Sequence, residues 1–89
     1  MAELGEELRR ERVRRNLTFK DVEQVLHIKT TYLEAIEDGN YDIIPGQVYV
    51  KGFIRNYGNY LDLDGDRLVK VYQGQVGDID TFSLLSVTR

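Results

Sequence analysis

The chain has 89 residues, and its 12 Lys and Arg side chains against 15 Asp and Glu give a formal net charge of −3. This length fits one small domain, which has too little core to enclose the deep active site of a large enzyme. The absence of cysteine excludes a disulfide framework, a thiolate metal site and a cysteine nucleophile.

Residues 4–15 predict the first helix, because acidic side chains come before arginines in the order that the helix dipole favours. Asn16 follows, and asparagine tolerates the left-handed conformation that ends many helices. A second helix is expected over residues 19–26, where apolar residues recur at helical spacing. Thr18 precedes it, and Asp21 lies three residues later, close to the pattern of a capping box.

A short turn and a third helix come next. His27 is expected in the turn, because histidine is enriched at positive φ and the chain has no second histidine or cysteine with which to share a metal. The third helix is expected to end at Gly39, in the usual place of a C-terminal glycine. The second helix, the turn and the third helix have the lengths of a helix-turn-helix.

The second half of the chain predicts two more helices. Residues 40–44 are expected to form a loop, after which Pro45 can open a helix over about residues 46–60. A fifth helix is expected to end near Gly74. The sequence therefore predicts an all-α domain of five helices, with a helix-turn-helix, over residues 1–74. Residues 75–89 lose the helical pattern and are expected to be a linker or flexible tail.

Five stretches form a longer pattern: LGEELR (residues 4–9), LTFKDV (17–22), IKTTYLEAIEDG (28–39), YDIIPGQVYVKGFIRNY (41–57) and LDLD (61–64). This pattern resembles the N-terminal cytoplasmic domain of the RodZ family of bacterial cell-shape proteins, a variant of the phage-repressor helix-turn-helix class. The resemblance thus implies a five-helix helix-turn-helix domain of the phage-repressor type. The resemblance implies a non-enzymatic adaptor on the cytoplasmic side of the bacterial inner membrane, which binds the actin-like filament protein MreB and couples it to the membrane. It also implies a transmembrane helix and an extracytoplasmic region, which either lie beyond Arg89 or were removed.

Catalysis has no support in the sequence. The chain has no second histidine and no glycine-rich phosphate loop. The run from Asp62 to Asp66 lacks the glutamate that a calcium loop needs at its twelfth position, which is Gln73. No enzymatic activity, cofactor or metal is therefore expected.

The predicted fourth helix has an aromatic and an aliphatic edge. At about 100° per residue, its rings span angles of about 0° to 80° and its aliphatic side chains about 100° to 140°. The rings are Tyr49, Phe53, Tyr57 and Tyr60, and the aliphatic side chains are Val50, Ile54 and Leu61. The aliphatic edge is expected in the core, whereas the position of the rings is left open between core and surface. A buried tyrosine needs a partner for its hydroxyl, which favours partial exposure. The resemblance implies that Phe53 and Tyr57 contact MreB, with Tyr49 and Tyr60 as supporting or core rings.

Charge weighs against DNA as the partner. A DNA-binding surface should be basic, yet the third helix carries Glu34, Glu37 and Asp38. A DNA-binding transcriptional regulator is the alternative function, with sequence-specific binding disfavoured. The first helix does carry exposed arginines for contact with anionic lipid or nucleic acid, or simply with solvent: Arg9, Arg10, Arg14 and Arg15.

The resemblance implies one structural ion pair. In the phage-repressor class an arginine near the end of the first helix pairs with the glutamate that closes the third helix. Arg12 and Glu37 occupy these places in the chain. The implied pair is partly buried and bidentate, and it fixes the geometry of the fold.

Overall fold

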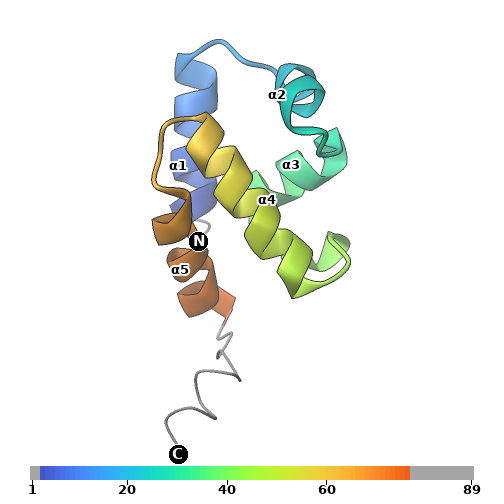
Figure 1. The fold of residues 1–89 in the computed structure, drawn as a ribbon, viewed down its shortest axis with the longest axis vertical. Coiled ribbons are helices and arrows are strands. Elements are labelled where there is room, and N and C mark those ends of the chain that lie inside the picture. Colours follow the sequence, from blue (N-terminus) through green and yellow to red (C-terminus); the bar gives the residue numbers. More distant parts are fainter. Residues whose placement is uncertain (1–2, 77–89) are drawn as a thin grey trace, which may run out of the picture.

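The structure is a computed structural model and describes residues 3–76. In this stretch the chain forms five α-helices and one short 3-10 helix, and it has no strand (Figure 1). The α-helices are α1 (Glu3–Arg14), α2 (Phe19–Leu26), α3 (Thr30–Asp38), α4 (Gln47–Tyr60) and α5 (Gly65–Val76), and the 3-10 helix covers Tyr41–Ile43. The predicted all-α, five-helix architecture is confirmed.

The turns on either side of α2 form for local reasons. The Asp21 amide donates to the Thr18 hydroxyl at 3.1 Å, and the Thr18 amide donates to the Asp21 carboxylate at 2.9 Å. This is the predicted capping box. Asn16 and His27 adopt the left-handed backbone conformation, with φ of 58° and 59°. Both predicted turn positions are therefore confirmed.

The segment before α4 differs from the prediction. Residues 41–43, which were expected to be loop, form the 3-10 helix, and α4 begins at Gln47. The reason is Gly46, which has φ of 101°. This conformation is open to glycine and strained for other residues. The chain therefore turns once more after Pro45, which lies outside the helix that it was expected to open.

The end of α5 also differs from the prediction. The helix continues through Gly74 to Val76, so residues 75 and 76, which were assigned to the tail, belong to the helix. The Tyr41 hydroxyl donates to the Gln75 side chain at 3.2 Å and so holds the last turn against the 3-10 segment. A helical glycine lowers helix propensity without ending the helix. The rest of the predicted tail, residues 77–89, lies outside the described residues.

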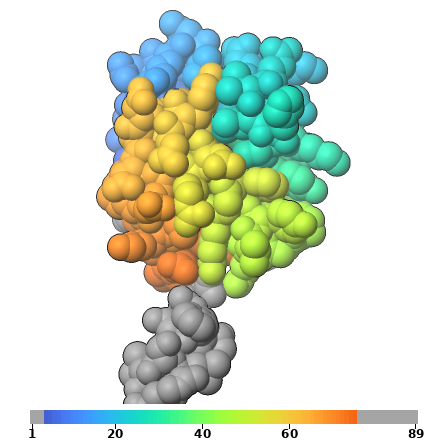
Figure 2. Space-filling model, viewed as in Figure 1, coloured from blue at the N-terminus to red at the C-terminus, as the bar shows by residue number. Residues whose placement is uncertain are grey.

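The core lies where α1, α3, α4 and α5 meet, and each contributes fully buried side chains: Leu8, Leu33, Ile54 and Leu68. The predicted aliphatic edge of α4 is confirmed, because Val50, Ile54 and Leu61 are all buried. The opposite side of α4 faces solvent. Figure 2 shows α4, in yellow, running across the front of the molecule between α5 on one side and α2 and α3 on the other.

Candidate partner-binding surface

The rings of α4 are buried to very different degrees. Tyr49 is 60% exposed, Phe53 is partly buried against the core, and Tyr57 is completely buried. This order follows the angle around the helix, because Tyr57 lies next to the aliphatic edge and Tyr49 lies furthest from it. The aromatic edge thus runs from the surface into the core within two turns.

Tyr57 is not the exposed anchor that was expected. Its hydroxyl donates to the carboxylate of Glu37, so the ring is buried with its polar atom satisfied. Burial raises the pKa of Tyr57, and the hydrogen bond to Glu37 raises it further, so the hydroxyl stays neutral. The expectation failed because it assumed a dry core with no partner for the hydroxyl.

Glu37 also forms the ion pair that the resemblance implied. The Arg12 Nε lies 2.8 Å from one carboxylate oxygen of Glu37, and the Arg12 Nη2 donates to the other at 3.1 Å. The two side chains are only 13% and 3% exposed. The hydrogen bond to Glu37 raises the pKa of Arg12. We call Arg12, Glu37 and Tyr57 the buried network, which joins α1, α3 and α4.

Arg12 makes two further contacts that tie α1 to the chain leading into α2. Its Nη1 donates to the Leu17 carbonyl oxygen at 2.9 Å. Its guanidinium carbon also lies 4.1 Å from the centre of the Phe19 ring, a cation–π contact. The arginine thus engages α2 as well as α3, which no pairwise spacing in the sequence would indicate.

Three rings lie together on the solvent side of α3 and α4, and we call Tyr32, Phe53 and Tyr49 the aromatic surface. The Tyr32 and Phe53 rings stack with centres 5.8 Å apart and planes inclined by 21°. The Tyr49 ring centre lies 6.2 Å from that of Phe53. Lys29 Nζ lies 5.9 Å from the centre of the Tyr32 ring. Tyr32 and Phe53 are partly buried and Tyr49 is 60% exposed, and such grouped rings can present contact area that loses little entropy on binding.

The sequence reasoning missed Tyr32 and included Tyr60. In the structure Tyr32 is partly buried and directly precedes Leu33, which is fully buried. The signal available in the sequence was the position of Tyr32 next to an apolar residue that faces the core. Tyr60 is partly buried at the other end of α4. It lies about 16 Å along the helix from Tyr49, because each residue adds about 1.5 Å. The aromatic surface therefore does not include Tyr60.

Two of the four arginines that were proposed to contact lipid or nucleic acid form ion pairs within the chain. Arg14 lies 2.8 Å from Glu11, and Arg15 contacts both Glu11 and Asp62, at 3.3 and 3.1 Å. The hydrogen bond from Arg14 lowers the pKa of the Glu11 carboxyl, so these charges largely cancel. By contrast, Arg9 and Arg10 are exposed and have no charged partner among the described residues.

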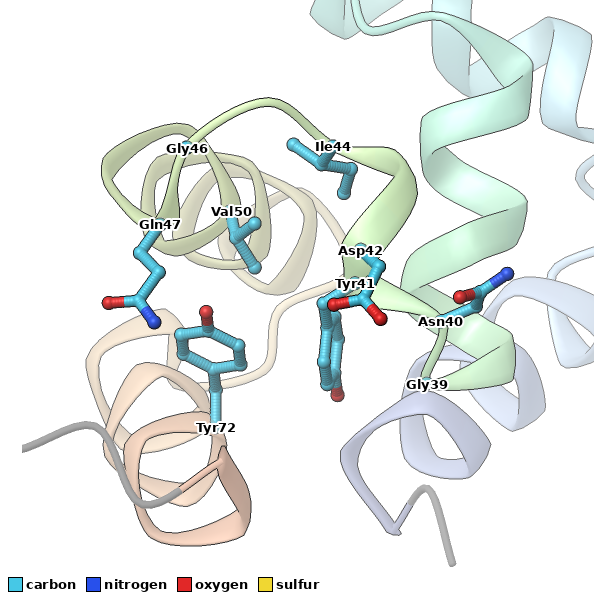
Figure 3. Close-up of a pocket in the computed structure, with 9 residues that line it drawn as sticks. All are labelled: Gly39, Asn40, Tyr41, Asp42, Ile44, Gly46, Gln47, Val50 and Tyr72. Atoms are coloured by element: carbon cyan, nitrogen blue, oxygen red, sulfur yellow. The ribbon is translucent and has the colours of Figure 1, made fainter.

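A polar hollow of about 510 Å³ is lined by residues of the 3-10 segment, α4 and α5 (Figure 3). Tyr41 and Tyr72 lie on its floor with their rings edge to face and their centres 4.9 Å apart. Burial raises the pKa of Tyr41 to about 12, and the charge of Tyr72 adds to this. Asp42 is the only charged residue that lines the hollow, which thus presents no acid–base pair. Nor do residues 3–76 contain a group of metal-binding side chains.

In a helix-turn-helix that binds DNA, α3 would be the helix that enters the DNA groove, and here its exposed side includes acidic residues. In α3 the exposed side chains include Glu34 and Asp38, which would face phosphate. We therefore expect footprinting at physiological salt to show no protected site of defined sequence. Weak binding through Arg9 and Arg10 should be indifferent to sequence and should fall steeply with salt. A protected site that persists when both arginines are replaced by glutamine would overturn this prediction.

Residues 7–68 of the chain match the model of a protein family whose description is helix-turn-helix domain. Because the match covers more than half of the chain, the protein belongs to this helix-turn-helix family. Among residues 3–76, none of the helices combines the length and apolar character that a bilayer crossing requires. No solved structure gave a significant match.

Two relatives make the relation more specific. The chain is 26% identical over 84 residues to the cytoskeleton protein RodZ of Streptococcus pneumoniae, a match that covers 94% of this chain and 30% of that protein. It is 38% identical over 60 residues to YmfM of Bacillus subtilis, named as an uncharacterized membrane protein, with 67% and 21% covered. These matches confirm the resemblance to a RodZ-type helix-turn-helix domain. The chain spans less than a third of either relative.

Proposed function

We propose that the chain is the adaptor domain of a bacterial cell-shape protein, and that it binds an MreB-type actin-like filament protein. The observation that carries this proposal is the aromatic surface, where Tyr32, Phe53 and Tyr49 form a continuous row of rings on the outside of α3 and α4. Tyr49 is 60% exposed and leads to the partly buried Phe53 and Tyr32, and a contiguous exposed apolar patch on a protein surface marks a site of contact with a partner. The similarity to a protein named for the cytoskeleton supports this choice of partner.

Within this proposal the rings of α4 have different roles. Phe53 and Tyr49 are the anchors that touch the filament, and Lys29 beside Tyr32 favours an acidic rim on the partner. Tyr57 does not touch the filament but fixes α4 from the inside through Glu37. The binding mode is helix-in-groove, with anchors one turn apart on α4.

The proposed location is the cytoplasmic side of the inner membrane. The relative named as a membrane protein supports this placement. Arg9 and Arg10, which are exposed and unneutralised among the described residues, would face the anionic lipid. Two arginines contribute about 1 kcal/mol each near such a surface, so they would orient the domain without anchoring it.

Replacing Phe53 with alanine is expected to weaken binding to polymerised MreB by about 2 kcal/mol or more, which is roughly 30-fold in Kd. Stability should fall less than after a deletion in the core, because the ring is only partly buried. Co-sedimentation with filaments and thermal unfolding measure the two effects. Val25→Ala is the control, since Val25 is an exposed apolar residue of α2, at 54%. Undiminished binding by a folded Phe53→Ala variant would remove the aromatic surface from the interface.

A further inference from the structure

The polar hollow described above is lined by one carboxylate and by no basic side chain. Its volume of about 510 Å³ lies in the range of sites that take ligands, roughly 300 to 1,000 Å³. Figure 3 shows Gln47 and Tyr72 on one side of the hollow and Asn40, Tyr41 and Asp42 on the other. The polar side chains of the lining thus come from three separate parts of the fold.

The charge of Asp42 is not neutralised within the part of the chain that the structure describes. Asp42 is exposed, and no side chain of residues 3–76 forms an ion pair with it. Lys51 lies one turn after Gln47, but it does not line the hollow and has another interaction of its own. A carboxylate at the wall of a partly enclosed site attracts a cation from outside, because its charge is screened less there than in bulk water.

The other lining residues favour a flat cation. Tyr41 is partly buried and its hydroxyl is used by Gln75, at 3.2 Å, so its ring is what it offers to a ligand. A guanidinium group stacks on aromatic rings and donates several hydrogen bonds in one plane, whereas an ammonium group is a compact point charge. The side-chain oxygens of Asp42, Asn40 and Gln47 accept such bonds. The lining therefore suits arginine better than lysine.

The position of the hollow favours an arginine that is carried by a polypeptide. Gly46 lines the hollow and lies against Tyr49, because a Cβ at Gly46 would be 3.4 Å from a ring carbon of Tyr49. Tyr49 is 60% exposed and the adjacent Val48 is 81% exposed, so apolar surface of the kind that contacts proteins adjoins the hollow. The amides of Asn40 and Gln47 also match peptide groups, which a free polyamine lacks.

We infer that the hollow receives the guanidinium group of an arginine side chain from a polypeptide partner, with Asp42 as its ion-pair partner, Tyr41 stacked against it and Gln47 as a hydrogen-bond acceptor. This inference goes beyond the proposed function, which assigns binding to the aromatic surface. A charged contact of this kind contributes specificity more than affinity. It would select partners that present an arginine beside an apolar patch.

The test titrates the isotope-labelled full chain with Nα-acetyl-arginine amide and follows the side-chain amide signals of Asn40 and Gln47 by NMR. We expect saturable shifts with a Kd on the order of millimolar, because the probe is small. The neutral isostere Nα-acetyl-citrulline amide should bind about ten-fold more weakly or worse, since it lacks the charge that Asp42 attracts. The lysine analogue should bind more weakly than the arginine probe.

Three variants assign the effect to the hollow. Asp42→Asn should weaken binding of the arginine probe about ten-fold and leave Tm almost unchanged, because Asp42 is exposed. Glu34→Gln is the control, because it removes an exposed carboxylate of α3 that does not line the hollow, and it should bind as the wild type does. Gln47→Ala removes an exposed acceptor at the start of α4 and should also weaken binding, which keeps the test decisive if Asp42→Asn does not fold.

Each contrary outcome is definite. The inference is wrong if the wild type shows no saturable shift up to about 50 mM of the arginine probe, or if the citrulline probe binds equally well. It is also wrong if Glu34→Gln weakens binding as much as Asp42→Asn does. Tighter binding of spermidine than of the arginine probe would replace the polypeptide by a free polyamine, and equal binding of the lysine analogue would overturn the choice of arginine. Filaments take no part in the titration, so none of these results bears on the proposed function.

Discussion

Replacing Arg12 with alanine is expected to lower the free energy of unfolding by about 3 to 5 kcal/mol, because it leaves the carboxylate of Glu37 buried without its cation. The change also removes the bond to the Leu17 carbonyl and the contact with the Phe19 ring. A domain of this size has a total stability of roughly 5 to 15 kcal/mol, so much of the population would unfold at modest denaturant concentration. Urea denaturation followed by circular dichroism measures the loss.

Arg14 supplies the matched control. It lies on the same helix and pairs with Glu11 at 2.8 Å, but its side chain is 63% exposed. An exposed pair of this kind contributes little, because water screens the charges. Arg14→Ala should therefore leave the denaturation midpoint almost unchanged. Equal effects of the two substitutions would show that the Arg12–Glu37 pair does not hold the fold together.

Tyr57→Ala is expected to destabilise the domain by about 3 to 5 kcal/mol, because it opens a cavity among fully buried side chains. It also takes from Glu37 the hydroxyl donor of the buried network. Tyr57→Phe keeps the ring and removes only that hydroxyl, so it should cost about 1 to 3 kcal/mol. Thermal and urea unfolding of the two variants separate the packing of the ring from its hydrogen bond.

The same variants distinguish Tyr57 from Phe53. Under conditions in which it is folded, Tyr57→Phe should bind filaments with nearly the wild-type affinity, because the ring does not reach the aromatic surface. Phe53→Ala should show the opposite combination, a stable fold and weak binding. A Tyr57→Ala variant with wild-type stability and no binding would instead place that ring in the interface.

Local features of the fold were predictable, because their causes lie within a few residues. The Thr18 cap, the Asn16 and His27 turns and the buried edge of α4 all follow from neighbouring residues or helical spacing. The start of α4 was not predictable. Pro45 favours the start of a helix, whereas the next residue, Gly46, is free to adopt a positive φ and so to turn the chain once more before the helix begins.

Features that depend on distant partners were harder to predict. The environment of Tyr57 is set by Glu37, which is 20 residues away in sequence. Helical spacing alone does not decide whether a tyrosine at the boundary of the core is buried or exposed. Here the carboxylate of Glu37 accepts the hydrogen bond of the Tyr57 hydroxyl, which allows the ring to be buried. Similarly, the stacking of Tyr32 on Phe53 depends on how α3 and α4 pack, which no pattern within either helix specifies. The family resemblance supplied the Arg12–Glu37 pair, which periodicity would not have indicated.

The contact between α4 and α5 has a mechanical consequence. The aromatic surface lies on α3 and α4, and α5 is the last described helix. A pull between a bound filament and the end of α5 would therefore load the contacts that hold α5, which are those with α4 and α1 and the Tyr41–Gln75 hydrogen bond. The contact is tight: a Cβ at Gly65 would lie 2.4 Å from the Arg55 carbonyl oxygen, and Arg55 also pairs with Asp66. Resistance to such a pull depends on the rate of unfolding and not on equilibrium stability. The resistance of the domain to such a pull would therefore depend in part on this close-packed contact, which lies outside the buried network.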